Sequence, residues 1–323
     1  MSTIEDVAKY SGFSTATVSR VLNNKGPVSE KAVLAIQEAM RQLDYHPNNM
    51  ARALVMGHSN TIGVILPSHN TYFWNEVAVE MEKSAREIGY HIVFRFAEPD
   101  REEIDRCVSD LRASQVSGII QAAGQREDVV KAANIPILSL ISNRDGIPAV
   151  VSDDDQGGRL ATRHLIERGC TYLVHISGDL SCSNHADQRS FAFIRECEHQ
   201  GIPYRLYQGY SQQAPEEQCL ALIEHIFAEN PRLDGIFAGN DIMAARCVSY
   251  ALSRGIRIPD QLRVVGYDDI SISSLLYPPL TTIRQNYKMI SATAVRTIVA
   301  MANKEQPSEP APIPVELIVR QTT

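Results

Sequence analysis

Apolar side chains in the first 45 residues recur at helical spacing in three short runs. Thr3 and Asp6 form a capping-box variant at the start of the first run, and Gly12 suits the tight turn that ends it. Ser14 and Ser29 stand where the second and third runs begin, as N-cap residues do. The predicted inward positions are Ile4, Val7, Ala8, Val18, Val21, Leu22, Val33, Ile36, Met40 and Leu43. Three short helices with a tight turn between the first two predict a helix-turn-helix.

The outward face of the second predicted helix is small and polar, and the segment 14–23 contains no acidic residue. Threonine is not favoured at an exposed helix position, because it loses side-chain freedom there. A surface that approaches phosphates avoids carboxylates. We therefore interpret this helix as one that enters the major groove of DNA. The alternative is a plain three-helix bundle whose exposed Thr and Ser side chains are only solvated.

From residue 61 onward, short β-rich runs alternate with amphipathic helical runs. The strand-like runs are TIGVIL, HIVFRF, SGIIQ, PILSLI and AVVSD, followed by TYLVHISG, YRLYQG, GIFAGN and LRVVGYDD. Helical patterns cover residues 75–88, 102–113, 156–168, 187–200, 215–229 and 241–254. Such alternation predicts parallel sheets covered by helices. The two series, of about five strands each, predict two doubly wound lobes.

A short segment joins these two parts of the chain. Pro47 suits the first position of a helix and Gly57 suits its end, while Met50 and Leu54 share a face. A helix of about ten residues is marginal alone in water. We expect it to form only when something packs on it, although the same pattern fits an ordinary linker helix.

Charge is unevenly distributed along the 323-residue chain, whose net charge is −7. Residues 1–60 hold six Lys or Arg and five Asp or Glu, against 25 and 33 in the remainder. Phosphate contacts are therefore expected at the N-terminus, with weak long-range steering. The six cysteines are scattered without zinc spacing, which is typical of reduced, buried thiols. With neither a signal-peptide pattern nor a long apolar run, we expect a soluble cytoplasmic protein.

Polar and aromatic side chains follow several predicted strands, where parallel sheets bind ligands. Asn240 and Asp241 follow one strand, Asp268 and Asp269 follow another, and Arg189 lies near the start of a helix. Such donors and acceptors, with the aromatic residues at 72–74, suit a polyhydroxylated ligand. Trp74, the only tryptophan, would serve as a stacking platform.

Each of these features has a less specific interpretation. Asp268 and Asp269 fit capping of the next turn, with Asp269 the better candidate. Phe73 or Tyr72 fits a core position. The acidic run 153–155 precedes a helix, where the helix dipole favours acids, so we predict no metal there.

The motifs DVAKYSGFSTATVSRVLNN and YHPNNMARAL resemble those of the lac repressor (LacI/GalR) family of bacterial transcription regulators. The resemblance continues through TIGVILPS, GGRLATRHLIERG, FAGNDIMAA, VVGYDDISISSLLYPPLTTIRQ and ELIVRQ, in order and at family spacing. It covers nearly the whole chain. The chain departs from the family pattern at 70–74 and 189–193.

This resemblance implies an α/β architecture with a helix-turn-helix domain (1–46), a hinge helix and linker (47–60) and a periplasmic-binding-protein-like core (61–323). Lobe 1 of the core would span about 61–169 and 285–313, and lobe 2 about 170–284 and 314–323. The sheets would be doubly wound and parallel. An effector bound between the lobes would control the hinge helices of a homodimer on a palindromic operator.

The resemblance also implies roles for individual residues. Thr15 and Ala16 would read bases together with Arg20, while Leu54 would wedge into the minor groove. The full predicted DNA-binding set is Ser14, Thr15, Ala16, Thr17, Arg20, Asn23, Ser29, Asn48, Ala51, Arg52 and Leu54. The predicted effector-binding set is Phe73, Trp74, Arg189, Tyr210, Asn240 and Asp268.

The sequence thus favours a non-enzymatic, effector-controlled repressor with no cofactor, metal or membrane partner. A sugar or sugar derivative is the preferred effector, and a purine-like corepressor is the alternative. A solute-binding protein of a transporter shares the two-lobed fold, but the attached helix-turn-helix argues against it. An enzyme using Asp268 and Asp269 as acid and base lacks any supporting catalytic motif.

Overall fold

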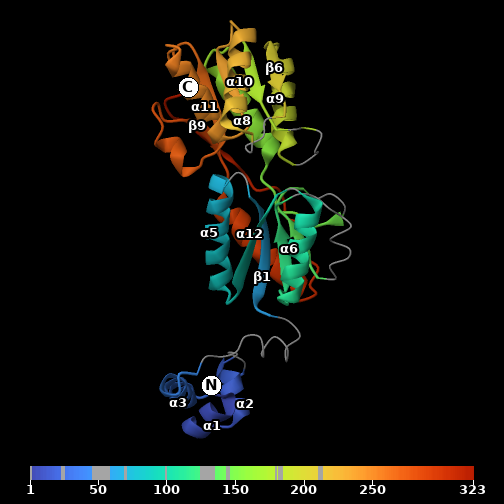
Figure 1. Cartoon of the computed structure of the whole chain (residues 1–323), viewed down its shortest axis with the longest axis vertical. Helices are drawn as coiled ribbons and strands as arrows, with labels where there is room; N and C mark the ends of the chain where they lie inside the picture. The colour runs from blue at the N-terminus through green and yellow to red at the C-terminus, as the bar shows by residue number, and fades with distance from the viewer. Residues whose placement is uncertain are drawn as a thin grey trace. The chain divides into compact units, whose positions relative to one another are not determined.

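The computed structural model divides into two compact units, Met1–Ser59 and Asn60–Thr323, which are described separately (Figure 1). The structure describes residues 2–22, 26–45, 59–68, 71–98, 100–123, 135–142, 146–178, 180, 185–209 and 214–323. The predicted hinge helix, within 47–60, lies almost wholly outside these ranges.

The N-terminal unit contains the three predicted helices, α1 (Ile4–Ser11), α2 (Thr15–Leu22) and α3 (Glu30–Gln42). Thr3 and Asp6 form a full capping box, and Gly12 ends α1 with a φ of 74°. Ser29 caps α3 by accepting a hydrogen bond from the Ala32 amide. Val7, Val18 and Ile36 are among the buried side chains that join the helices, as the periodicity predicted.

Lobe 1 of the larger unit is built on a parallel sheet of order β2-β1-β3-β4. Its strands are β1 (Thr61–Pro67), β2 (His91–Ala97), β3 (Gly118–Gln121) and β4 (Ile137–Ser139). Its helices are α5 (Thr71–Glu87), α6 (Arg101–Ala113) and α12 (Tyr287–Ala302). Alternate residues of β1 face opposite sides: Ile62 packs with α5 and α12, whereas Ile65 packs with α6. Helices therefore cover both faces of the sheet (Figure 1).

Lobe 2 is built on a six-stranded sheet of order β10-β9-β8-β7-β5-β6, parallel except for β10. The strands are β5 (Leu173–Ile176), β6 (Tyr204–Tyr207), β7 (Gly235–Ala238), β8 (Arg263–Asp268), β9 (Thr281–Arg284) and β10 (Glu316–Ile318). The helices are α8 (Asp154–Glu167), α9 (Asp187–Gln200), α10 (Glu216–Glu229), α11 (Asp241–Ser253) and the short η3 (Ser271–Ser274). Residues of α8 and α9 share one core with this sheet, and those of α10 and α11 share another. The predicted doubly wound α/β fold is confirmed in both lobes.

Two details differ from the sequence-based expectation. The run AVVSD forms no strand; Ala149 and Ser152 make only isolated bridges, to Ser139 and Ile313. The helix α8, which we placed in lobe 1, packs on α9 and on the six-stranded sheet of lobe 2. Gly157 and Gly158 permit this close approach. A Cβ on Gly157 would lie 2.2 Å from the Tyr267 hydroxyl, so a larger residue would push α8 away.

The chain passes between the lobes in three segments, near residues 150–153, 285–286 and 313–315. The first and third run side by side, since the Ile313 amide donates to the Val151 carbonyl and the Asp153 amide donates to the Ile313 carbonyl. These crossovers hold the residues that connect the candidate site to both lobes. None of the described helices is both long and apolar enough to cross a membrane.

Candidate DNA-binding surface and effector site

The predicted DNA-reading residues stand at the exposed start of α2. Ser14 accepts a hydrogen bond from the Thr17 amide, at 3.2 Å, and thereby caps the helix. Thr15, Ala16 and Arg20 are exposed, and Val18 on the opposite side is fully buried. The helix thus presents its small polar face outward while its apolar face fixes it to the module.

Other predicted DNA contacts are placed only in part. Ser29 is exposed at the start of α3, and Thr17 is half-buried beside Ser14. Five predicted contacts lie outside the described residues: Asn23, Asn48, Ala51, Arg52 and Leu54. The roles of all these residues stay predictions.

The candidate effector site centres on Arg189, in the first turn of α9. Its Nε donates to Asp154 Oδ1 at 2.5 Å, and its Nη1 donates to the Gly239 carbonyl at 2.9 Å. The guanidinium carbon lies 3.5 Å from the centre of the Tyr267 ring, and the Tyr267 hydroxyl donates to Asp154 as well. Arg189 is therefore fixed at the carboxyl ends of β7 and β8.

The charge of Arg189 is balanced within this cluster. Burial alone would raise the pKa of Asp154, but Arg189 and His185 outweigh burial and hold that pKa below its usual range. Burial alone would lower the pKa of Arg189, and the Asp154 charge reverses this effect. Among the described residues, Asp154 and Gly239 engage two of the five guanidinium N–H donors, which leaves donors for a ligand.

Asp268 lies at the end of β8 with a backbone φ of 107°, outside the usual range for a residue with a side chain. The residue is 4% exposed, and its carboxyl accepts a hydrogen bond from Gln285 Nε2 at 2.7 Å. Burial raises the pKa of Asp268 to about 8, despite the nearby Arg189 charge. The next residue, Asp269, pairs instead with Arg284 and Arg320.

Asn240 and Asp241 mark the junction of β7 and α11. Asn240 caps the helix, because its Oδ1 accepts from the Met243 amide at 2.9 Å. Its amide group is then the donor left for a ligand. Asp241 is fully buried and accepts hydrogen bonds from the Ser273 and Thr282 hydroxyls and from the backbone amide of Ile270, just before η3. Burial raises the pKa of Asp241 to about 7.

Two of the predicted aromatic contacts, Phe73 and Trp74, lie in lobe 1. Phe73 is 8% exposed and belongs to the lobe core, as its alternative interpretation expected. Its ring meets Trp74 edge-on at 4.8 Å and Tyr287 at 5.5 Å. Tyr287 in turn donates a hydrogen bond to the Asp268 carbonyl, which connects this cluster to lobe 2. Tyr210 lies outside the described residues.

Comparison with known proteins assigns the chain that carries this site to a family. The family of bacterial regulatory proteins, lacI family, matches residues 3–48, and a periplasmic binding protein-like domain matches residues 162–323. A ribose operon repressor of Halalkalibacterium halodurans is 34% identical over 329 residues, covering 100% of this chain and 97% of the relative. The chain belongs to the lacI family of bacterial regulatory proteins.

Solved structures agree with this lacI-family assignment. A lac repressor dimer bound to operator and the anti-inducer ONPF matches with a TM-score of 0.85 and 27% identity, over 99% of this chain and 98% of that one. A periplasmic binding protein/LacI transcriptional regulator from Alkaliphilus metalliredigens QYMF, complexed with D-xylulofuranose, matches with a TM-score of 0.73 and 29% identity. It covers 82% of this chain and 99% of that one. This lacI-family protein is a DNA-binding transcriptional regulator.

Of the six predicted effector contacts in this lacI-family regulator, the structure brings Arg189, Asn240 and Asp268 to one edge of the lobe 2 sheet. Sequence reasoning missed Asp154, Tyr267, Gln285 and Tyr287, which fix that edge. The acidic run 153–155 was a usable signal for Asp154. We assigned it to the helix dipole, and Asp153 does cap α8.

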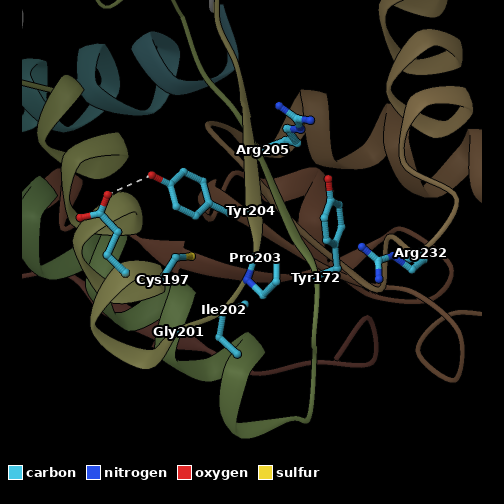
Figure 2. A pocket seen from close by; sticks show the side chains of 9 residues that line it. Tyr172, Cys197, Gly201, Ile202, Pro203, Tyr204, Arg205 and Arg232 are labelled. Atoms are coloured by element: carbon cyan, nitrogen blue, oxygen red, sulfur yellow. Dashed lines mark hydrogen bonds between the residues drawn. The ribbon is translucent and has the colours of Figure 1, made fainter.

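A separate hollow of about 510 Å³ lies at the opposite, amino edge of the same sheet. Figure 2 shows its Tyr172, Tyr204 and Arg232 side chains. Tyr172 precedes β5 and Tyr204 begins β6, whereas ligands of such sheets bind at the carboxyl ends. We therefore assign the effector site to the Arg189 edge rather than to this hollow.

Proposed function

We propose that this protein is a homodimeric transcriptional repressor whose operator affinity is controlled by a small neutral sugar. The effector would bind at the carboxyl edge of the lobe 2 sheet, facing lobe 1. The observation that carries the proposal is the convergence of Arg189, Asn240 and Asp268 at this edge, each fixed by its neighbours. Preorganised donors and acceptors of this kind distinguish hydroxyl patterns.

The electrostatics of the edge favour an uncharged ligand. Asp154 already balances the charge of Arg189, and Asp268 and Asp241 both have raised pKa values because they are buried. An added phosphate would therefore meet an environment that already disfavours negative charge. A protonated Asp268 donates as well as accepts, which matches a sugar hydroxyl.

The size of the sugar is proposed from the related proteins. The relative from H. halodurans is a ribose operon repressor, and the regulator from A. metalliredigens was solved with D-xylulofuranose. Both names contain a five-carbon sugar. We therefore propose D-ribose or a related pentose as the effector, with a purine as the alternative.

The DNA-binding half of the proposal rests on the exposed face of α2. Thr15, Ala16 and Arg20 would contact base edges, and Ser14, Thr17 and Ser29 would contact phosphates. The start of α2 is exposed, and helix N-termini favour phosphate binding. Asn23, with Leu54 and the other hinge residues, would complete the contacts, acting in the bacterial cytoplasm on nucleoid DNA.

A second copy of the chain would pack on an exposed apolar surface of lobe 2. Leu275 is 80% exposed and Tyr277 is 87% exposed, and Tyr277 lines a hollow of about 490 Å³ with Leu252 and Ile258. Monomers rarely expose such adjacent large apolar side chains. The lac repressor similar to this chain was solved as a dimer on operator. Two-fold symmetry then requires a palindromic operator.

The effector is tested by thermal-shift titration of the full-length protein with D-ribose, ribose 5-phosphate, adenine and hypoxanthine. We expect stabilisation by D-ribose and a change in the affinity for a palindromic operator selected from random DNA. Asp268→Asn should weaken ribose binding about tenfold or more, because a buried polar partner is altered. Asp155→Asn is the matched control, since Asp155 pairs with exposed Arg195.

Three outcomes would contradict parts of this proposal. Stabilisation by hypoxanthine and not by ribose would replace the sugar with a purine. Stabilisation by ribose 5-phosphate alone would refute the preference for a neutral ligand. Ribose turnover, followed by chromatography of the incubated sugar, would refute the non-enzymatic assignment.

A further inference from the structure

Gln285 holds the carboxyl of Asp268 from the segment that leaves β9 and crosses to lobe 1. Its Nε2 donates to Asp268 Oδ1 at 2.7 Å. Two residues further along, the Tyr287 hydroxyl donates to the Asp268 carbonyl. The same crossover therefore fixes both the side chain and the backbone of Asp268, which has a φ of 107°. Such backbone conformations persist only where the surroundings impose them.

The other end of the Gln285 amide is bound to a different crossover. Ser152 Oγ donates to Gln285 Oε1 at 2.5 Å. Ser152 is separated from Gln285 by 133 positions and lies on the segment that runs from lobe 1 to α8. Ser152, Gln285 and Asp268 are all at most 5% exposed. Buried hydrogen bonds of this kind are costly to leave unmade.

The third crossover joins the same assembly through the backbone. Ser152 forms an isolated bridge with Ile313, and the neighbouring amides of Asp153 and Ile313 donate across the pair. A ligand that displaces Asp268 would therefore alter contacts in all three segments between the lobes, and the Gln285 side chain would transmit the change. Gln285 is the residue in direct contact with both Asp268 and Ser152.

We propose that Gln285 is a positioning residue that couples effector binding at Asp268 to the three crossovers. This inference rests on the proposed function, since it assigns the regulation of that same site. The amide donates at one end and accepts at the other, so a change at Asp268 alters the bond to Ser152. In this proposal the lobes have two relative arrangements, one in which both hydrogen bonds of Gln285 are made and one in which they are not. An effector that contacts Asp268 shifts the equilibrium between these arrangements.

The first test separates coupling from binding in the full-length protein, with D-ribose as the probe and a selected palindromic fragment as operator. Ser152→Ala removes only the far end of the connection. We expect its ribose Kd to stay within about twofold of wild type. The factor by which ribose changes operator affinity should fall about three- to tenfold, which lies within the range of about 0.5–2 kcal/mol that such coupling residues reach. Gln285→Leu should reduce both the ribose affinity and this factor.

The matched control is Ser291→Ala on α12. The Ser291 hydroxyl is also fully buried and donates to a carbonyl, that of Val77, at 3.0 Å. Ser291→Ala should lower the Tm as Ser152→Ala does and leave the ribose effect on operator affinity unchanged. An unchanged ribose effect in Ser152→Ala, or an equal loss in Ser291→Ala, would overturn the positioning role.

The second test needs no ligand. Thermal unfolding is measured for Ser152→Ala, Asp268→Ala and the double variant. Because Gln285 connects the two sites, the Tm shift of the double variant should differ from the sum of the single shifts. Additive shifts would overturn the inference even if ribose acts as proposed. If ribose has no effect on wild type but the shifts are non-additive, the proposed effector is wrong and the positioning role stands.

Discussion

The α2 surface and the Arg189 edge present their functional side chains in opposite ways. Thr15, Ala16 and Arg20 stand exposed on a helix that an apolar face holds in place. Arg189 and Asp268 are largely enclosed, and each is held by a partner from another element of the fold. A DNA-reading face must meet a large partner without rearrangement, whereas a small ligand is recognised by groups that are already desolvated and oriented.

This difference in exposure determines whether a substitution changes mainly binding affinity or also the free energy of unfolding. Removing an exposed side chain from α2 leaves no buried group without a partner. Removing Arg189 leaves Asp154 buried beside Tyr267 with its main charge partner gone. Substitutions at the two places should therefore divide their effects differently between affinity and the free energy of unfolding.

The largest effect is expected for Arg189→Met. Breaking a buried ion pair by removing one partner costs about 3–5 kcal/mol of unfolding free energy. Urea unfolding of the full chain at pH 7 measures this loss. The control is Arg195→Met, whose partner Asp155 is 42% exposed; such exposed pairs contribute about 0–1 kcal/mol. Equal losses in the two variants would show that the Arg189 edge is not stabilised by its enclosed pair.

An intermediate effect is expected for Arg20→Ala. If Arg20 contacts a base, operator affinity should fall by about 1–3 kcal/mol, or roughly 5- to 150-fold, with little change in the free energy of unfolding. Fluorescence anisotropy at fixed salt measures the affinity. Arg41→Ala serves as control, because Arg41 is exposed on α3 and pairs with Glu38. A similar loss in Arg41→Ala would indicate a general charge effect rather than base reading.

The same difference governs what the sequence could predict. The N-terminal helices follow from local periodicity and N-capping, so Ser14 and Ser29 were correctly placed at helix starts and Val18 at a buried helix position. The ends of strands predicted where Asn240 and Asp268 would lie. The connection behind Asp268 could not be predicted, because Gln285, which donates to Asp268, also meets Ser152 across 133 positions. The assignment of α8 failed for a related reason: the packing of Gly157 against Tyr267 leaves no trace in helical periodicity.

The last expected effect is a pH dependence that the Arg189 edge should show and the α2 surface should not. Burial raises the pKa of Asp268 to about 8 and that of Asp241 to about 7, well above the usual range for an unfolded chain. The folded protein thus binds more protons than the unfolded chain between about pH 4 and 8. The contribution of these acids to stability is full below pH 4 and is lost as the pH rises toward 8.

His175 limits the range in which this loss is visible. Burial lowers its pKa to about 4, so its neutral form is favoured in the folded state and stability falls as the pH drops below about 6.5. Between pH 6.5 and 8 the acids dominate, and the free energy of unfolding should decrease by at most about 1.4 kcal/mol per pH unit for each proton. Asp268→Asn should flatten this slope, because the amide does not titrate, while Arg20→Ala should leave it unchanged. A free energy of unfolding that increases from pH 6.5 to 8 in the wild-type protein would mean that Asp268 is ionised in the folded state. Asp268 would then have no proton to donate, and the proposed contact with a neutral sugar would lose its donor.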